Sequence, residues 1–296
     1  MRESSIESIC IFGSVARESA DEHSDRDVLV VAENPHRRKE LGNCWKEKGW
    51  SVASFSPRRF QRMVDKGSLF VQHLKLESRM VEDEAGWLAE TLERAVPKKS
   101  YEFDAMASVN LARPIERFNP GLQLSEVPLS ADLAYVAVRN FGICYLADRD
   151  RLSFDYSRIV DLLGKEFCLS SVETELLLSL RAAKSCYRKE GACAQSSLGS
   201  VGALSSILSK FFLRKPLHAI DPRSPVRDLG CGYSTLRDFE ASVIARLGRL
   251  PSESDIQSMG LETIWRWVTQ PREYTWQVRN FAALELGKGI EGSVFR

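Results

Sequence analysis

The chain has 296 residues, 44% of them hydrophobic and 27% charged, and its formal net charge at pH 7 is +1. This length is sufficient for two domains, each with a substantial core. The near-zero net charge excludes a basic protein that binds nucleic acid nonspecifically, so a nucleic-acid partner would need a local basic patch.

The cysteines and the hydropathy indicate a cytoplasmic protein without membrane contact. The seven cysteines are scattered and include no C-x-x-C pair, a pattern typical of reduced thiols in a cytosolic protein. The polar N-terminus does not resemble a signal peptide, and no apolar run approaches the roughly 20 residues that span a bilayer.

The first hundred residues alternate between strand and helix patterns. Strands are expected at 6–12, 28–31 and 50–55, with an extended piece at 80–81. Helices are expected at 35–48, 57–63 and 69–75, the second of them started by the N-cap and N1 proline of Ser56-Pro57. This order predicts a small α+β layer with its helices on one side of a mixed sheet.

From Trp87 onward the pattern is helical. Ser130 is expected to cap a helix over 131–146, and Ser170 with Glu173 forms a candidate capping box for a helix that ends at Glu190. Further helices are expected at 200–214, 234–248 and 271–287. The fold class is therefore predicted as α+β, with a sheet-containing domain at 1–97 and an α-helical bundle domain at 98–296.

The candidate chemistry lies between Gly13 and Val31, which read GSVARESADEHSDRDVLVV. Asp25 and Asp27 are two residues apart, so in an extended strand both carboxylates point to the same face. Such oxygens suit Mg²⁺ or Mn²⁺, which commonly take substrate phosphates as further ligands. A turn at Gly13 and Ser14 can offer N–H groups and a hydroxyl to those phosphates. The stretch therefore predicts a site for a metal and a nucleotide, whereas a charged loop between two strands is the alternative.

The arrangement resembles the signature of the polymerase-β-like nucleotidyltransferases, in which a Gly-Ser pair precedes Asp-x-Asp on a strand. Ten residues separate Ser14 from Asp25 here. The resemblance implies that Gly13 and Ser14 hold the phosphates of a nucleoside triphosphate and that Asp25 and Asp27 are the catalytic, metal-binding residues.

Three basic side chains near the motif have different expected roles. Arg17 lies inside the motif and is the better candidate for a phosphate contact. Arg26 alternates with the two aspartates, so it should point to the opposite face of the strand. Lys75 lies on a Leu-rich helix that the resemblance places near the nucleotide, which makes it a further candidate for nucleotide binding.

One part of the resemblance is missing. In the family, a third carboxylate lies on the strand that aligns with 50–55, and this stretch contains no acid. A base outside the strand, such as Glu77, can replace it; the enzyme can work with a reduced metal site; or the domain can bind a nucleotide without transferring it.

Two weaker motifs lie in the second half of the chain. Arg139-Asn140 followed by Tyr145 resembles the motif of HEPN ribonucleases, with tyrosine in place of the histidine, and packing of Tyr145 is the favoured interpretation. Residues 228–232 (DLGCG) resemble a methyltransferase glycine loop but lack the preceding strand, which favours a turn. Aromatic and basic residues between Trp265 and Phe281 can stack on bases, although core packing is favoured.

Together these features predict a metal-dependent nucleotidyltransferase that moves a nucleoside monophosphate from a nucleoside triphosphate to an acceptor and releases pyrophosphate. The acceptor is open between an RNA 3′ end, a protein hydroxyl and a small molecule. The helical domain would bind that substrate or be a HEPN-like bundle. The alternative is a catalytically impaired nucleotide- or RNA-binding regulator, of the kind found in defence or toxin–antitoxin systems.

Overall fold

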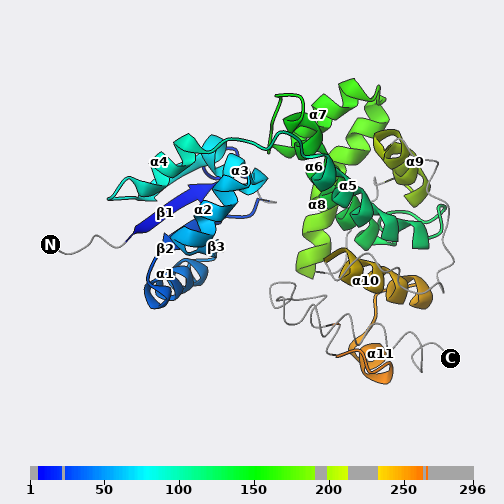
Figure 1. Ribbon diagram of the computed structural model, residues 1–296. Helices are drawn as coiled ribbons and strands as arrows, with labels where there is room; N and C mark the ends of the chain where they lie inside the picture. The colour runs from blue at the N-terminus through cyan, green and yellow to red at the C-terminus, as the bar shows by residue number, and fades with distance from the viewer. Residues whose placement is uncertain (1–5, 22–23, 191–198, 213–232, 263–264, 266–296) are drawn as a thin grey trace. The chain divides into compact units, whose positions relative to one another are not determined.

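The computed structural model describes residues 6–21, 24–190, 199–212, 233–262 and 265 (Figure 1). The chain forms two compact units. The N-terminal unit combines residues Met1–Tyr101 with the segment Leu146–Asp155, and the helical unit combines Glu102–Tyr145 with Tyr156–Arg296. The N-terminal unit is therefore not one continuous stretch of chain.

The N-terminal unit is built on a four-stranded sheet in the order β3-β2-β1-β4. The strands are β1 (Glu7–Phe12), β2 (Asp27–Ala32), β3 (Ser51–Phe55) and β4 (Ser78–Glu82). β1 pairs antiparallel with both β2 and β4, whereas β3 pairs parallel with β2. The sheet is mixed, and each strand lies where the sequence predicts it.

Helices cover both faces of this sheet, so the expected one-sided layer is wrong. The helices are α1 (Pro35–Glu47), α2 (Pro57–Asp65), α3 (Leu69–Glu77) and α4 (Trp87–Arg94). One core joins Phe12 and Leu29 to residues of α2, α3 and α4, and the other joins Ile11 and Val28 to Leu41 of α1. The reason is visible in β1 and β2, whose near-continuous apolar runs require cover on both sides.

Side-chain caps begin two of these helices. Asn34 Oδ1 accepts hydrogen bonds from the backbone N–H groups of His36 and Arg37, at 2.9 and 3.2 Å, and starts α1. Ser56 caps α2 by accepting from the N–H of Arg59, with Pro57 next in the chain. The predicted Ser56-Pro57 signal is confirmed, because an N-cap acceptor followed by a fixed φ favours the first helical turn.

The helical unit contains seven α-helices and one short 3-10 helix among the described residues. They are α5 (Glu102–Ala112), η1 (Arg113–Arg117), α6 (Pro128–Ala147), α7 (Tyr156–Glu166), α8 (Ser171–Glu190), α9 (Val201–Phe212), α10 (Tyr233–Leu247) and α11 (Glu253–Ser258). The last residues of α6 group with the N-terminal unit. In the part of the chain that the structure describes, no helix is long and apolar enough to cross a bilayer.

The helix starts predicted from the sequence have mixed outcomes. The capping box before α8 is confirmed: Ser170 N–H donates to Glu173 Oε2 at 2.9 Å, and Glu173 N–H donates to Ser170 Oγ at 3.3 Å. The cap predicted at Ser130 is wrong, because α6 already begins at Pro128 and buries Ser130 in its first turn. Proline suits that first position. The helix predicted at 271–287 lies outside the described residues.

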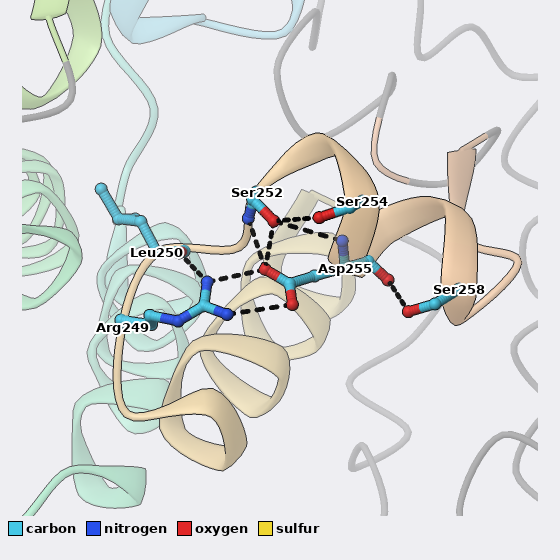
Figure 2. Close-up of polar contacts among 6 residues, drawn as sticks. All are labelled: Arg249, Leu250, Ser252, Ser254, Asp255 and Ser258. Atoms are coloured by element: carbon cyan, nitrogen blue, oxygen red, sulfur yellow. Dashed lines mark hydrogen bonds and ion pairs between the residues drawn. The ribbon is translucent and has the colours of Figure 1, made fainter.

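A compact polar cap begins α11 (Figure 2). Ser252 Oγ accepts from the Asp255 N–H, and the Asp255 carboxylate accepts from the Ser252 N–H at 2.7 Å. Arg249 donates to both carboxylate oxygens of Asp255, at 2.6 and 3.0 Å. The Arg249 guanidinium and the Ser252 donors hold the pKa of Asp255 well below its ordinary value, so this short helix has a charged cap at neutral pH.

Buried ion pairs lie inside the helical unit. Arg117 on η1 donates from Nε and Nη2 to the two carboxylate oxygens of Asp238 on α10, at 2.7 and 2.9 Å. Both residues are almost fully buried, as are Arg237 and Asp132, which also pair with each other. Because a buried charge is tolerated only with a well-oriented partner, these pairs fix how η1, α6 and α10 pack.

Breaking the Arg117–Asp238 pair is expected to destabilise the protein strongly. In Asp238→Asn or Arg117→Met the remaining charge loses the group that pairs with it, and such changes typically lower the free energy of unfolding by about 3–5 kcal/mol. Urea unfolding followed by circular dichroism measures the loss. Lys165→Met, which breaks the exposed Lys165–Asp161 pair, is the control and should change stability little. Equal losses in buried and exposed variants would contradict the prediction.

Candidate functional site

A tight turn follows β1 and begins at Gly13. Gly13 has a φ of +76°, a conformation that strains any residue with a Cβ. Its N–H donates to the backbone oxygen of Glu77 at 3.1 Å, and its own oxygen accepts from the Arg17 N–H at 3.1 Å. A further bond from Ser19 N–H to the Ser14 oxygen, at 2.9 Å, closes the turn. This backbone geometry explains why the motif begins with glycine.

The two aspartates lie beside this turn on the neighbouring strand. Asp27 is the first residue of β2, is half-buried and pairs with Phe12 of β1. Asp25 is exposed and lies in the irregular segment just before the strand. Between them, Arg26 places its guanidinium 4.4 Å from the ring centroid of Trp50. Trp50 belongs to the core on the α1 side, so Arg26 points away from the face that carries Asp27, as its alternation predicts.

Asp27 and His73 both lie close to the position that a Cβ atom of Gly13 would occupy. A methyl group on Gly13 would lie 3.7 Å from Asp27 Oδ2 and 3.9 Å from both Cε1 and Nε2 of His73. His73 comes from α3, on the face of the sheet opposite α1. His73 is not among the site residues predicted from the sequence, because its position depends on how α3 packs against β1.

Three neighbours fix the imidazole of His73. Its Nε2 lies 3.0 Å from Glu77 Oε2, one helical turn along α3. Its ring stacks on Phe154 with a centroid distance of 4.3 Å and meets the edge of Phe12 at 5.5 Å. The side chain is only 12% exposed. The signals in the sequence are the i,i+4 spacing of His73 and Glu77 and the place of His73 on the helix that the resemblance puts near the nucleotide; nothing local predicts Phe154.

Glu77 is the carboxylate at the centre of this cluster. It forms an ion pair with Arg17, which also pairs with Asp155 at 3.4 Å. Burial works to raise the pKa of Glu77, but the hydrogen bond and charge of His73 and the Arg17 guanidinium outweigh it and hold the pKa below its ordinary value. Glu77 is therefore ionised at neutral pH, and its low pKa makes it a weak proton acceptor.

The basic side chains predicted to contact phosphate are engaged within the protein. The Arg17 guanidinium is paired with two carboxylates. Lys75 Nζ donates to the backbone oxygens of Glu93 and Ala95, both at 2.8 Å, and so caps the end of α4. Lys75 and His73 are two residues apart on a helix and therefore point to different sides of it. A phosphate contact by Arg17 or Lys75 stays a prediction.

The strand on which the resemblance leads us to expect a third carboxylate is β3, and it contains no acidic residue. In the parallel pairing of β2 with β3, Asp27 lies opposite Ser51 and Leu29 lies opposite Ala53. Within the described ranges, no group of three or more histidine, cysteine or acidic residues is arranged to hold a metal ion. Asp25 and Asp27 nevertheless fit Mg²⁺, which is often held by one or two carboxylates and completed by substrate phosphates and water.

A comparison with protein families finds a match within the N-terminal unit. Residues 1–85 match the nucleotidyltransferase domain family. This part of the chain is a nucleotidyltransferase domain. The match runs from β1 to β4, contains the Gly-Ser and Asp-x-Asp residues and confirms the resemblance drawn from the motif. No curated protein and no solved structure matches the chain.

The nucleotidyltransferase domain also has a basic groove, on the face of the sheet opposite Asp27. The groove has a volume of about 290 Å³ and lies between α1 and β3. Arg38, Lys39 and Lys46 contribute its charge, and no acidic side chain lines it; the other lining residues are Pro35, Gly42, Asn43, Val52 and Ser54.

The weaker motifs do not form a second site among the described residues. The Tyr145 hydroxyl donates to Glu166 at 3.0 Å, and its ring packs on Phe141 and Phe167. These contacts agree with the packing role favoured for Tyr145. Residues 228–232 and the aromatic residues from Trp267 to Phe281 lie outside the part of the chain that the structure describes.

A methyl group at Gly13 is expected to weaken nucleotide binding. Gly13→Ala strains the backbone by about 1–2 kcal/mol and also fills the space between Asp27 and His73. Gly49→Ala is a matched control, because Gly49 has a φ of +80° and open space around it. Both variants should show a similar loss in the free energy of unfolding, measured in urea. Only Gly13→Ala should bind nucleoside triphosphate about tenfold more weakly. Unchanged binding in Gly13→Ala would contradict this site.

Proposed function

We propose that this chain is a nucleotidyltransferase dependent on Mg²⁺ or Mn²⁺, which transfers a nucleoside monophosphate from a nucleoside triphosphate to an acceptor. The observation that carries this proposal is the convergence of Asp27 on the Gly13 turn within a nucleotidyltransferase domain. Asp25 and Asp27 hold the metal ion, and the turn holds the phosphates.

The hydrogen bonds of the turn indicate which of its groups meet the phosphates. The Gly13 N–H is already bonded to Glu77, so the role of Gly13 is to turn the chain and leave space. Among the described residues, the N–H groups of Ser14 and Val15 have no backbone acceptor. Together with the Ser14 hydroxyl they can donate to phosphate oxygens, as consecutive N–H groups in a turn do for anions.

The reaction depends mainly on positioning and on neutralising charge. A hydroxyl oxygen of the acceptor attacks the α-phosphorus and loses its proton to solvent, the bond from that phosphorus to the bridging oxygen breaks, and pyrophosphate leaves with the electron pair. A divalent ion held by Asp25 and Asp27 would supply Lewis-acid neutralisation of the phosphate charge. The turn would fix the far end of the triphosphate.

Removing either aspartate carboxylate is expected to abolish transfer. Asp25→Asn and Asp27→Asn each remove a metal ligand with little change in shape, and we expect a loss of about a hundredfold or more in rate. The assay incubates the chain with Mg²⁺ and labelled nucleoside triphosphates, together with total RNA and cell lysate as acceptors.

The control is Asp21→Asn, which makes the same change in the same loop and should retain activity. Label found on RNA, protein or a small molecule identifies the acceptor. Saturable binding of triphosphate to the unmodified chain without any transfer would overturn the enzyme proposal and favour a nucleotide-binding regulator.

The basic groove favours RNA among the acceptors. The net charge of the chain is +1, so binding of a polyanion needs a local patch, and the groove supplies three cations without an acid. Ser54 lines the groove and lies on the same strand as Ser51, which pairs with Asp27. Because the groove and Asp27 lie on opposite faces of the sheet, an RNA bound in the groove would reach the aspartates around the edge strand β3, on which Ser51 and Ser54 are about 10 Å apart.

Charge reversal in the groove is expected to weaken RNA binding and leave nucleotide binding unchanged. The double variant Lys39→Glu/Lys46→Glu should lose about tenfold in RNA affinity and show a shallower dependence on salt. Arg62→Glu/Lys66→Glu makes the same change in charge at exposed Arg62 of α2 and at exposed Lys66, which follows that helix, on the other face of the sheet. Filter binding at several salt concentrations measures both, and an equal loss in the two variants would contradict the groove as the RNA site.

A further inference from the structure

Arg26 lies between the two aspartates in the chain, but its guanidinium is on the other face of the sheet. It lies 4.4 Å from the ring centroid of Trp50, and Trp50 belongs to the core on the α1 side. The backbone oxygen of Arg26 accepts from the Ser51 N–H at 2.7 Å, and Ser51 begins the edge strand β3 opposite Asp27. Arg26 is therefore on the face that carries the basic groove, at the end of β3 beside the aspartates.

The groove and the Arg26 side chain follow one another along β3. Trp50, Val52 and Ser54 alternate along the chain, so their side chains point to the same face of the sheet. Val52 and Ser54 line the groove, and Trp50 lies under the guanidinium of Arg26. Two residues of extended chain, the separation of Trp50 and Val52, span about 7 Å. Arg26 therefore extends the positive charge of the groove toward the aspartates.

The contacts of Arg26 leave its N–H groups available to a ligand. The side chain is exposed, and among the described residues its guanidinium forms no ion pair, in contrast to that of Arg17. The contact with Trp50 holds the side chain without a carboxylate partner. A guanidinium carries its N–H donors in a planar fork that fits phosphate oxygens. Arg26 is therefore a cation held in place and suited to bind a phosphate.

We propose that Arg26 binds a phosphate of the RNA acceptor and directs the RNA from the basic groove around β3 to Asp25 and Asp27. This proposal rests on the proposed function, because it requires that the aspartates are the site of transfer and that RNA is the acceptor. A path from the groove to the aspartates brings RNA phosphates close to two carboxylates, and a cation at this point of the path offsets the repulsion. Arg26 is a positioning residue and takes no part in making or breaking bonds.

The experiment compares two variants of Arg26 with the unmodified full chain. Arg26→Met removes the charge but keeps an unbranched side chain that packs on Trp50, whereas Arg26→Lys keeps the charge. Filter binding at several salt concentrations uses a labelled single-stranded RNA oligonucleotide, and urea unfolding verifies that both variants are folded. Arg26→Met should bind RNA about tenfold more weakly, with a salt dependence shallower by about one phosphate contact. Arg26→Lys should recover most of the affinity.

The matched control is Arg79→Met, which makes the same change on the same face of the sheet. Arg79 is exposed and lies opposite Ile11, a residue of the core on the α1 side. It belongs to β4, at the edge of the sheet farthest from β3. Arg79→Met should therefore bind RNA like the unmodified chain. Equal losses of RNA affinity in Arg26→Met and Arg79→Met would overturn the proposal, as would unchanged affinity in Arg26→Met.

Affinity for nucleoside triphosphate separates positioning of RNA from support of the aspartates. In calorimetric titration with Mg²⁺, Arg26→Met should bind triphosphate like the unmodified chain, while the KM for RNA rises in the transfer assay. Weaker triphosphate binding with unchanged RNA affinity would show that Arg26 supports the aspartates, and would overturn its role toward RNA. Label transferred to protein or a small molecule by a chain that binds no RNA also overturns that role but leaves the transferase proposal intact. Absence of triphosphate binding in the unmodified chain overturns the proposed function itself.

Discussion

Glu77 holds the turn at Gly13 through both its backbone and its side chain. Its backbone oxygen accepts from the Gly13 N–H, and its carboxylate pairs with Arg17 at the other end of the same turn and with His73. Because Glu77 ends α3 immediately before β4, one residue connects the turn, the helix and the sheet. The positions of the Ser14 N–H and of the imidazole both follow from this connection.

The same contacts limit what the site can do chemically. With its pKa lowered by His73 and Arg17 despite burial, Glu77 stabilises positive charge and is a poor base. On the face of Asp27, β3 carries Ser51, Ala53 and Phe55 and no acidic side chain. The domain therefore combines Asp27 at the Gly13 turn with a cluster of Arg17, His73 and Glu77, and the carboxylate of that cluster is a poor candidate for the base that activates an acceptor.

The parts of the site that the sequence predicts are those set by local spacing. Gly13 and Ser14 lie in the turn that follows β1, Asp27 begins the adjacent strand β2, and Asp25 lies just before it. The alternation that turns Arg26 toward Trp50 is a property of extended chain. His73 and Lys75 are close in sequence, yet packing directs only His73 to the turn and directs Lys75 to the end of α4. Cover on both faces of the sheet follows from the near-continuous apolar runs of β1 and β2, a pattern that the expected one-sided layer did not take into account.

The contribution of Phe154 and Asp155 has the least basis in the sequence. Both lie far along the chain from α3, in the segment Leu146–Asp155 that belongs to the N-terminal unit, and outside the stretch that matches the nucleotidyltransferase family. Yet Phe154 covers a face of the His73 ring and Asp155 pairs with Arg17. Residues outside the stretch that matches the family therefore contribute to this cluster. The aromatic contact fixes the imidazole, and Asp155 shares the guanidinium that, together with His73, lowers the pKa of Glu77.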